Sequence, residues 1–338
     1  MKKVILLVAM LVSISTLTAK EVSKVGTTAA RFLNIDVGAR GVGMGGAYVS
    51  VVDDASAIYW NPSCLGLIEK PQGYFNHTRW IMDVVINCVA VAIPVQDIGN
   101  FGFSAKFMSM GEMERTTINQ PDGTGELFDA ASYAVGISYA RSLTDRFAIG
   151  ITGKYINERI YHSSAHGLAI DVGTIYTTTF NNLKIGMSIT NYGTKMSMSG
   201  RDLLVQHDIS DLVEGNNPNI NATLNTGAYD IPLLFRFGIS MDLLQNMQNN
   251  SLVLALDALH PNDDKESLNW GVEYGFHKLF FLRLGYKSLF LPDSQEGLTA
   301  GAGFNFKWPG LGALRLDYAY QNTEWLDSFQ HFTFSIMF

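Results

Sequence analysis

From Tyr74 to the last residue, apolar residues alternate with small or polar residues in one short segment after another. In a typical segment Leu183, Ile185, Met187 and Ile189 are separated by lysine, glycine and serine. Successive side chains of a β-strand point to opposite faces, so each segment predicts a strand with one apolar face. Soluble β-sandwiches alternate too, but here the apolar faces end in Phe, Tyr and Trp, as in the aromatic girdles of membrane barrels.

The segments and their connections predict the fold class. We expect about fourteen strands, joined by connections of alternating length: short turns such as 142–145 and longer polar loops such as 111–130 and 192–230. Charged residues make up only 16% of the chain, against about 25% in soluble domains. We therefore predict an all-β protein, a transmembrane antiparallel β-barrel over residues 71–338, with a hatch or plug containing short helices before it.

The chain ends on a strand pattern with a terminal aromatic residue. Phe334, Ile336 and Phe338 fall on one predicted face, which resembles the C-terminal assembly signal of bacterial outer-membrane barrels. That resemblance implies outer-membrane lipid and the barrel-assembly machinery as partners.

The first 19 residues predict an export signal. Lys2 and Lys3 form a basic start, Val4 to Val12 are continuously apolar, and a cleavage site follows Ala19. We expect a protein exported to the bacterial outer membrane, with residues 20–70 as an N-terminal periplasmic segment and hatch.

Strand parity assigns a set of charged residues to the barrel interior, where buried charges need partners. Centring a turn on Lys278 places Glu273 opposite Arg283 and predicts a cross-strand ion pair. The same argument places Cys88 on the lipid face with Val84 and Ile86. The predicted lumen charges are Lys106, Lys154, Lys184, Arg236, Asp257, Glu273, Arg283, Lys287, Arg315 and Asp317.

The stretch from Gly38 to Gly66 carries the residues that could suggest chemistry. Gly41, Gly43 and Gly46 match the G-x-G-x-x-G fingerprint, but no alternating βαβ pattern follows, so we expect no cofactor. Glycine here fits close backbone packing inside a barrel and irregular dihedral angles. The expected hatch residues are Gly41, Gly43, Gly45, Gly46, Asp53, Asp54, Ser56, Asn61 and Pro62.

Polar hatch residues have structural interpretations of their own. Asp53 and Asp54 are expected to anchor the hatch to lumen cations, with Asp54 or Ser56 as a helix cap. Asn61-Pro62 predicts the turn towards the first strand. The chain lacks nucleophile-elbow, P-loop and zinc signatures, so we expect no catalytic site, no metal and no enzyme. The net charge of −7 gives no basic footprint for nucleic acid.

The same stretch, GARGVGMGGAYVSVVDDASAIYWNPSCLG, resembles the N-terminal signature of the PorV/PorQ family within the wider FadL-like barrels. Asp53-Asp54-Ala55-Ser56-Ala57 matches one family element closely. Asn61-Pro62-Ser63-Cys64-Leu65 departs from the family's Asn-Pro-Ala-Gly-Leu at two positions. The resemblance implies a hatch inside a fourteen-strand barrel.

The resemblance implies two functions. PorV-like members serve type IX secretion, binding or shuttling cargo proteins through cargo C-terminal domains and contacting translocon subunits. FadL-like members transport long-chain fatty acids or other hydrophobic small molecules, which would occupy the lumen. A structural barrel without transport is a third interpretation. The glycine-rich signature and a lumen of Gly, Ser and charges favour the secretion-associated barrel.

Overall fold

The computed structural model describes residues 24–208, 219–247, 249–291, 294–308, 310, 312–323 and 328–338. The predicted signal peptide lies outside these residues. Among them, no helix combines the length and the apolar character needed to cross a membrane.

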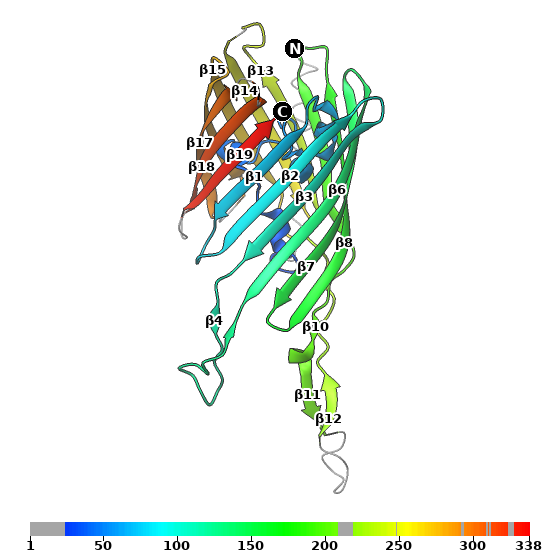
Figure 1. The fold of residues 1–338 in the computed structure, drawn as a ribbon, viewed down its shortest axis with the longest axis vertical. Helices are drawn as coiled ribbons and strands as arrows, with labels where there is room; N and C mark the ends of the chain where they lie inside the picture. Colours follow the sequence, from blue (N-terminus) through cyan, green and yellow to red (C-terminus); the bar gives the residue numbers. More distant parts are fainter. Residues whose placement is uncertain are drawn as a thin grey trace, which may run out of the picture.

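One antiparallel sheet closes on itself to form the barrel (Figure 1). Fourteen strands run in chain order around it and close through the pairing of β8 with β9; the two-residue β10 adds to the edge of β8. The predicted fold class is therefore confirmed. The barrel strands are β1 Gln72–Arg79, β2 Val85–Val95, β3 Gly99–Ser109, β6 Ala130–Thr144, β7 Phe147–Ile160, β8 Ser163–Thr177, β9 Lys184–Gly193, β13 Leu234–Asp242, β14 Ser251–Pro261, β15 Ser267–Phe276, β16 Phe280–Leu289, β17 Glu296–Trp308, β18 Gly312–Thr323 and β19 Phe329–Met337.

The remaining elements lie at the N-terminus and in two excursions from the barrel. The N-terminal elements are η1 Arg31–Asn34, α2 Ala39–Gly43, α3 Ala57–Trp60 and η2 Pro62–Leu67. The excursions contain β4 Met113–Glu114, β5 Leu127–Phe128, β10 Ser199–Gly200, η3 Arg201–Leu203, β11 Leu204–His207 and β12 Ile220–Thr223.

The two ends of the barrel differ. One end, here called the turn end, carries the C-terminus and connections such as 96–98, 145–146 and 277–279. The opposite end, here called the hairpin end, carries the β4–β5 and β11–β12 hairpins, which project well beyond the wall at the bottom of Figure 1. Other connections at the hairpin end are short, such as Tyr161-His162, because β7 and β8 extend further than the sequence pattern predicted.

The wall has unequal height. Strands β6 and β8 have 15 residues each, whereas β1 has 8 and β19 has 9. Since a strand rises about 3.3 Å per residue, the wall is tallest at β6–β8 and lowest at β19–β1. Both protruding hairpins leave from the strands on either side of the tall wall (Figure 1).

The N-terminal segment fills the barrel interior, where a girdle of inward-facing glycines lets its backbone touch the wall. A Cβ on Gly285 would lie 2.1 Å from the Gly45 nitrogen, and one on Gly271 would lie 2.3 Å from the Met44 oxygen. Six further barrel glycines meet hatch atoms in the same way: Gly102, Gly150, Gly173, Gly186, Gly238 and Gly301. Real side chains do not fit into such gaps, so the wall and the hatch are shaped for one another.

Residues 28–31 lie towards the hairpin end, where Thr28 and Arg31 bind the Asp263 carboxylate and the Ala30 amide donates to Glu158 at 3.0 Å. The hatch is held there by two carboxylates, that of fully buried Asp263 and that of half-buried Glu158.

The predicted orientation of β2 is wrong, as the position of Cys88 shows. The sequence argument placed Val84, Ile86 and Cys88 on the lipid face, but all three are buried inside the barrel. The alternate residues of β2, among them Val89 and Val91, are exposed. Because β2 is apolar on both faces, hydrophobicity could not choose between them; pairing of Cys88 with Lys106 fixes the orientation.

We predict that Gly285→Ala disturbs the hatch, whereas Gly153→Ala does not. The Gly285 methyl would collide with hatch backbone, and overpacking of this kind costs about 1–3 kcal/mol. The matched Gly153 site on β7 has nothing within 4 Å of its Cβ position. Thermal unfolding of the purified barrels measures the difference. Equal midpoints for the two variants would contradict the fitted-girdle interpretation.

Candidate functional site

The candidate site is the hatch, residues 24–70 as described here, together with the charged wall residues that hold it. The hatch backbone reverses sharply after α2, with positive φ angles of 65° at Gly45 and 76° at Gly46. That conformation favours glycine, so the expected glycine-rich stretch forms the tight bend facing β16. Gly41 is packed by Trp60, and Gly43 by Gly301 of the wall.

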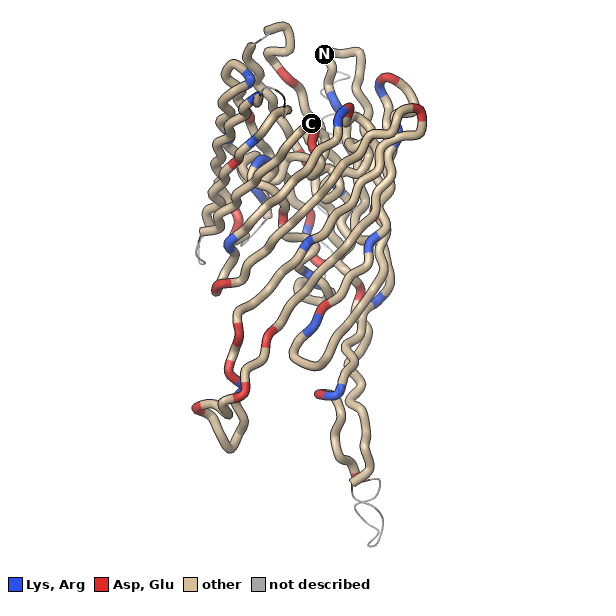
Figure 2. Tube along the Cα trace, viewed as in Figure 1, with Lys and Arg blue, Asp and Glu red and all other residues tan. Residues whose placement is uncertain are grey.

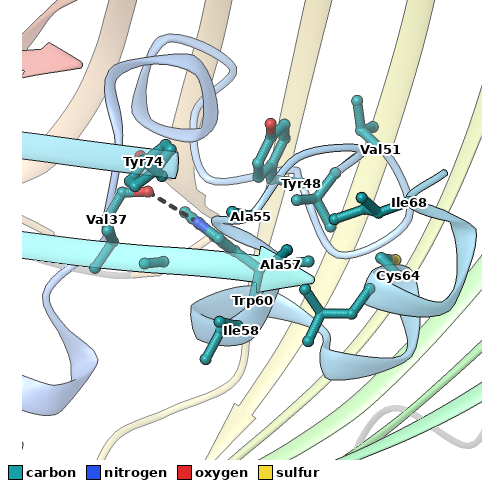
Figure 3. Packing of buried hydrophobic residues seen from close by; sticks show 14 of the residues in the cluster. Val37, Tyr48, Val51, Ala55, Ala57, Ile58, Trp60, Cys64, Ile68 and Tyr74 are labelled. Atoms are coloured by element: carbon teal, nitrogen blue, oxygen red, sulfur yellow. Dashed lines mark hydrogen bonds between the residues drawn. The ribbon is translucent and has the colours of Figure 1, made fainter. Parts of the chain in front are cut away.

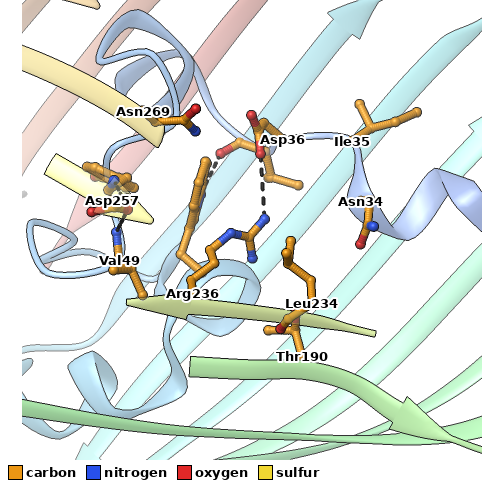
Figure 4. Close-up of polar contacts among 12 residues, drawn as sticks. Asn34, Ile35, Asp36, Val49, Thr190, Leu234, Arg236, Asp257 and Asn269 are labelled. Atoms are coloured by element: carbon orange, nitrogen blue, oxygen red, sulfur yellow. Dashed lines mark hydrogen bonds and ion pairs between the residues drawn. The ribbon is translucent and has the colours of Figure 1, made fainter. Parts of the chain in front are cut away.

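Asp36 anchors the hatch to cations of the wall. Its carboxylate lies 2.8 Å from the Lys287 Nζ and 3.7 Å from an Arg236 Nη, and little of any of the three side chains is exposed. Figure 4 shows Asp36 and Arg236 facing each other. Burial alone would raise the pKa of Asp36, but Lys287 and Arg236 outweigh it and lower the pKa from its ordinary value of 3.8. The carboxylate is therefore ionised at neutral pH and neutralises two wall cations.

Arg40 makes the reciprocal contact, from a hatch cation to a wall anion. Its Nε and Nη2 each donate to the Glu273 carboxylate at 2.8 Å, in the bidentate geometry that suits a guanidinium. Glu273 also accepts from the Arg283 Nε at 2.6 Å, so the cross-strand ion pair predicted from the sequence is present. Arg283 and Arg315 continue the network to Asp317, at 2.7 and 3.0 Å.

A third contact joins a buried wall carboxylate to hatch amides. The Asp257 carboxylate accepts from the backbone nitrogens of Tyr48 and Val49 at 2.8 and 2.9 Å (Figure 4). The Asn61 amide donates to the carbonyls of Val49 and Thr174 at 3.0 and 3.1 Å, so it connects two hatch segments to β8. Each contact satisfies polar groups that burial would otherwise leave unpaired.

Apolar packing completes the hatch. Trp60 is buried, meets Tyr48 edge-to-face at 5.4 Å, and donates from its indole nitrogen to the Val37 carbonyl at 2.9 Å (Figure 3). The Arg236 guanidinium lies 5.2 Å from the Trp60 ring centroid. The Tyr59 hydroxyl donates to wall carbonyls of Val89 and Ala105 and so packs against the wall.

Asp53 and Asp54 do not bind lumen cations, contrary to our expectation. Asp53 pairs with Arg40, a cation of the hatch itself, and its side chain is half exposed. Asp54 accepts from the Ser56 amide at 2.9 Å and from the Ser56 hydroxyl, which caps the turn before α3. Within the described residues Lys287 and Arg236 pair with Asp36, which takes the anchoring position instead.

The other expected residues take structural positions. Asn61 accepts from the Ser63 amide and Pro62 begins η2, so this step starts a short helix rather than leading directly to β1. Lys106 donates to the carbonyls of Leu33 and Ile35, and Lys154 pairs with Asp171 at 2.8 Å. At the C-terminus Phe334 faces outward, Ile336 is half-buried, and Phe338 follows β19.

Sequence reasoning missed the two hatch anchors. Arg40 was within the quoted signature, and as the only cation between Gly38 and Gly66 it was a detectable signal. Asp36 lies just outside that stretch and stands alone in an apolar setting. Its role depends on which cations of the wall lie near it. Strand parity predicts which face a wall residue occupies, but not which hatch residue it contacts.

Two spaces border the hatch. Towards the hairpin end a chamber of about 30 Å³ is lined by Lys106, Lys154 and Arg236 together with Asp36 and neutral residues. At the turn end lies a much larger recess of about 660 Å³, which Arg40 and Asp53 of the hatch help to line. No cluster of three or more metal-ligating side chains occurs in the described part of the chain.

Comparisons with known proteins agree on this architecture. Residues 18–200 match the family model described as type IX secretion system protein PorV. No curated protein matches the chain. Among solved structures, a Pseudomonas aeruginosa FadL homologue has a TM-score of 0.52 at 14% identity, covering 89% of this chain and 98% of its own. The Pseudomonas putida toluene transporter TodX has a TM-score of 0.56 at 12% identity, covering 89% and 96%. At these identities the structural likeness shows the fold.

We predict that Asp36→Asn loosens the hatch, because it removes the counter-charge that Lys287 and Arg236 share and leaves Lys287 paired with Glu296 alone. Breaking a buried ion pair on one side costs about 3–5 kcal/mol. Hydrogen exchange across residues 38–66 should therefore become faster. Asp54→Asn, which changes a carboxylate bound within the hatch, is the matched control.

The Asp36 effect should depend on pH. Because the folded pKa is lowered, the carboxylate stabilises the hatch at neutral pH, and this contribution is lost as the pH falls below about 3.8 through the folded value. The difference between wild type and Asp36→Asn should shrink accordingly. A constant difference between pH 7 and pH 3 would be inconsistent with an ionised anchor.

Proposed function

Because the chain belongs to the family of the type IX secretion system protein PorV, we propose that it serves protein secretion by holding exported cargo proteins at the cell surface. A closed barrel of this family lies in the bacterial outer membrane. In such barrels short turns face the periplasm and longer loops face outwards. The turn end then faces the periplasm and the hairpin end faces the cell surface.

The two protruding hairpins support this proposal most directly. Each is a two-stranded ribbon with one unpaired edge on either strand, a template for pairing with another chain. The β11–β12 ribbon exposes Leu204 and Ile220, and the β4–β5 excursion carries Ile118 fully exposed. These apolar side chains are therefore available to a partner, and apolar surface that gathers into a patch outside the lipid marks an interaction site.

The charge of the β4–β5 hairpin indicates what kind of partner it would bind. Acidic residues outnumber basic ones along the β4–β5 excursion (Figure 2). Arg115 pairs with Glu126 and Arg159 with Asp129, whereas Glu112 and Asp122 add further negative charge. This distribution favours a partner with a basic surface and steers its approach.

The filled lumen disfavours the alternative, a channel for hydrophobic compounds. The described structural neighbours include a toluene transporter and a monoaromatic hydrocarbon channel, CymD. In this chain the chamber on the hairpin side of the hatch measures about 30 Å³ and is lined by three cations, and the recess of about 660 Å³ at the turn end is lined by nine charged side chains. A cavity that holds even benzene measures about 150 Å³ and is apolar. Secretion is therefore the function that this lumen supports better.

Assembly partners follow from the same proposal. We assign Phe334, Ile336 and Phe338 to recognition by the barrel-assembly machinery, since two of them lie at the periplasmic end of the last strand. Translocon subunits and cargo C-terminal domains are the proposed partners of the surface hairpins. The proposed activity is binding and shuttling, without a catalytic step.

We predict that Leu204→Glu with Ile220→Glu reduces cargo recovery. Both residues are exposed on the surface ribbon, so the barrel should still fold. Loss of about 1.4 kcal/mol of contact energy lowers affinity tenfold. An affinity-tagged copy should recover about tenfold less of each exported protein, quantified by mass spectrometry.

The matched control is Leu243→Glu with Met247→Glu, two similarly exposed residues at the turn end. Recovery through the control should equal that of the wild type. Equal recovery through both double variants would argue against the hairpins. A hydrophobic small molecule bound stoichiometrically in the purified lumen would favour transport instead.

A further inference from the structure

The recess at the turn end carries cations that the structure leaves without partners. Nine charged side chains line its 660 Å³, five basic and four acidic. The acidic members are Asp53, Asp54, Asp242 and Glu273, and the basic members are Arg40, Lys184, Lys278, Lys307 and Arg315. The numbers of basic and acidic residues are nearly equal, but within the described part of the chain the acidic residues have partners and three of the basic residues do not.

All four carboxylates are engaged within the protein. Glu273 binds Arg40, Arg283 and Arg315 in the ceiling of the recess. Asp53 binds Arg40, and Asp54 binds Ser56. Asp242 accepts from the backbone amides of Leu244 and Leu252 at 2.9 Å each, so it shapes the β13–β14 turn.

Three lysines of the recess have no such partner. Lys184 begins β9, Lys278 lies in the β15–β16 turn and Lys307 lies near the end of β17. No ion pair or side-chain hydrogen bond involves their ammonium groups within the described residues. The lysines around the hatch differ: Lys106, Lys154 and Lys287 all bind carbonyls or carboxylates.

The three lysines lie in a recess, which strengthens the positive electrostatic potential that they produce there. A recess lined by one sign of unpaired charge between low-dielectric walls focuses its potential and attracts counter-ions. The recess opens at the turn end, inside the ring of strands, so lipid headgroups outside the barrel do not line it. Its ligand must therefore come from the periplasm.

The shape indicates an extended ligand. A second space of about 560 Å³ shares Asp53, Gln72, Lys307, Ala313 and Met337 with the first. It continues past Lys70 and Glu69, where the chain leaves the hatch for β1. Together they form one groove with Lys307 at the junction, longer than a small ion requires.

We propose that this groove binds an extended acidic peptide segment of a periplasmic protein. Lys184, Lys278 and Lys307 contact its carboxylates, and Val51, Phe281 and Met337 contact its apolar parts. The site lies on the opposite face from the cargo-binding hairpins and is independent of the proposed secretion role. It would attach the barrel to a periplasmic component.

The test uses the full-length barrel in a non-ionic detergent. The probe is a fluorescein-labelled peptide of alternating glutamate and glycine, and the reference peptide has glutamine in place of glutamate. Fluorescence anisotropy measures binding. We expect the acidic peptide to bind, the neutral one to bind at least tenfold more weakly, and the affinity to fall with rising salt.

The variant Lys184→Gln/Lys278→Gln/Lys307→Gln should weaken binding of the acidic peptide by thirtyfold or more, on the order of 2 kcal/mol. Its control, Lys195→Gln/Arg201→Gln/Lys265→Gln, removes three positive charges at the hairpin end and should bind as the wild type does. Heat-modifiable migration verifies that each variant is folded before the titration.

Several outcomes would overturn the proposal. Equal affinity for the acidic and neutral peptides would exclude charge recognition. Equal loss in both triple variants would mean that overall charge, not the groove, attracts the peptide. Displacement of the peptide by glycerol 3-phosphate at equal concentration would make the groove a small-anion site, and binding only to vesicles of anionic phospholipid would make it a lipid contact.

Discussion

Ion pairs between the hatch and the barrel wall, with cations and anions on both sides, hold the interior of this protein together. Asp36 of the hatch neutralises Lys287 and Arg236 of the wall, and Arg40 of the hatch binds Glu273 of the wall. A charge buried without a partner costs several kcal/mol, and the wall meets only part of this need itself, through Arg283 beside Glu273 and Glu296 beside Lys287. The hatch and the barrel are therefore parts of one folded unit, because each supplies the counter-charges that the other needs.

Close approach makes these ion pairs possible. The hatch backbone can approach the wall closely only where no wall side chain lies between them. The inward-facing glycines of the wall provide this space. Gly285 and Gly271 bring the hatch bend against β16 and β15, the strands that carry Lys287 and Glu273. The consequence is a lumen with little free space at its centre. Binding is left to the two ends, which carry different chemistry: apolar and acidic hairpins on one, unpaired lysines on the other.

Much of the barrel was predictable from the sequence, because a strand's side chains alternate with a period of two and lipid imposes an apolar face. Strand number, closure and the Glu273–Arg283 pair follow from that period together with one turn centre. Parity failed where a strand has two apolar faces, as at Cys88. It also could not assign Asp53 and Asp54, whose partners Arg40 and Ser56 lie within the hatch itself.

The sequence by itself therefore determined the architecture: an exported-type chain of alternating strands, a glycine-rich stretch suited to a crowded interior, and charges that must face the lumen. Only the tertiary structure decided which charges meet. Asp36 and Arg40 lie far from Lys287 and Glu273 in the chain, and an ion pair depends on distances of a few ångströms that periodicity does not encode. The same holds for Lys184, Lys278 and Lys307, which become one site because three strands end around a single recess.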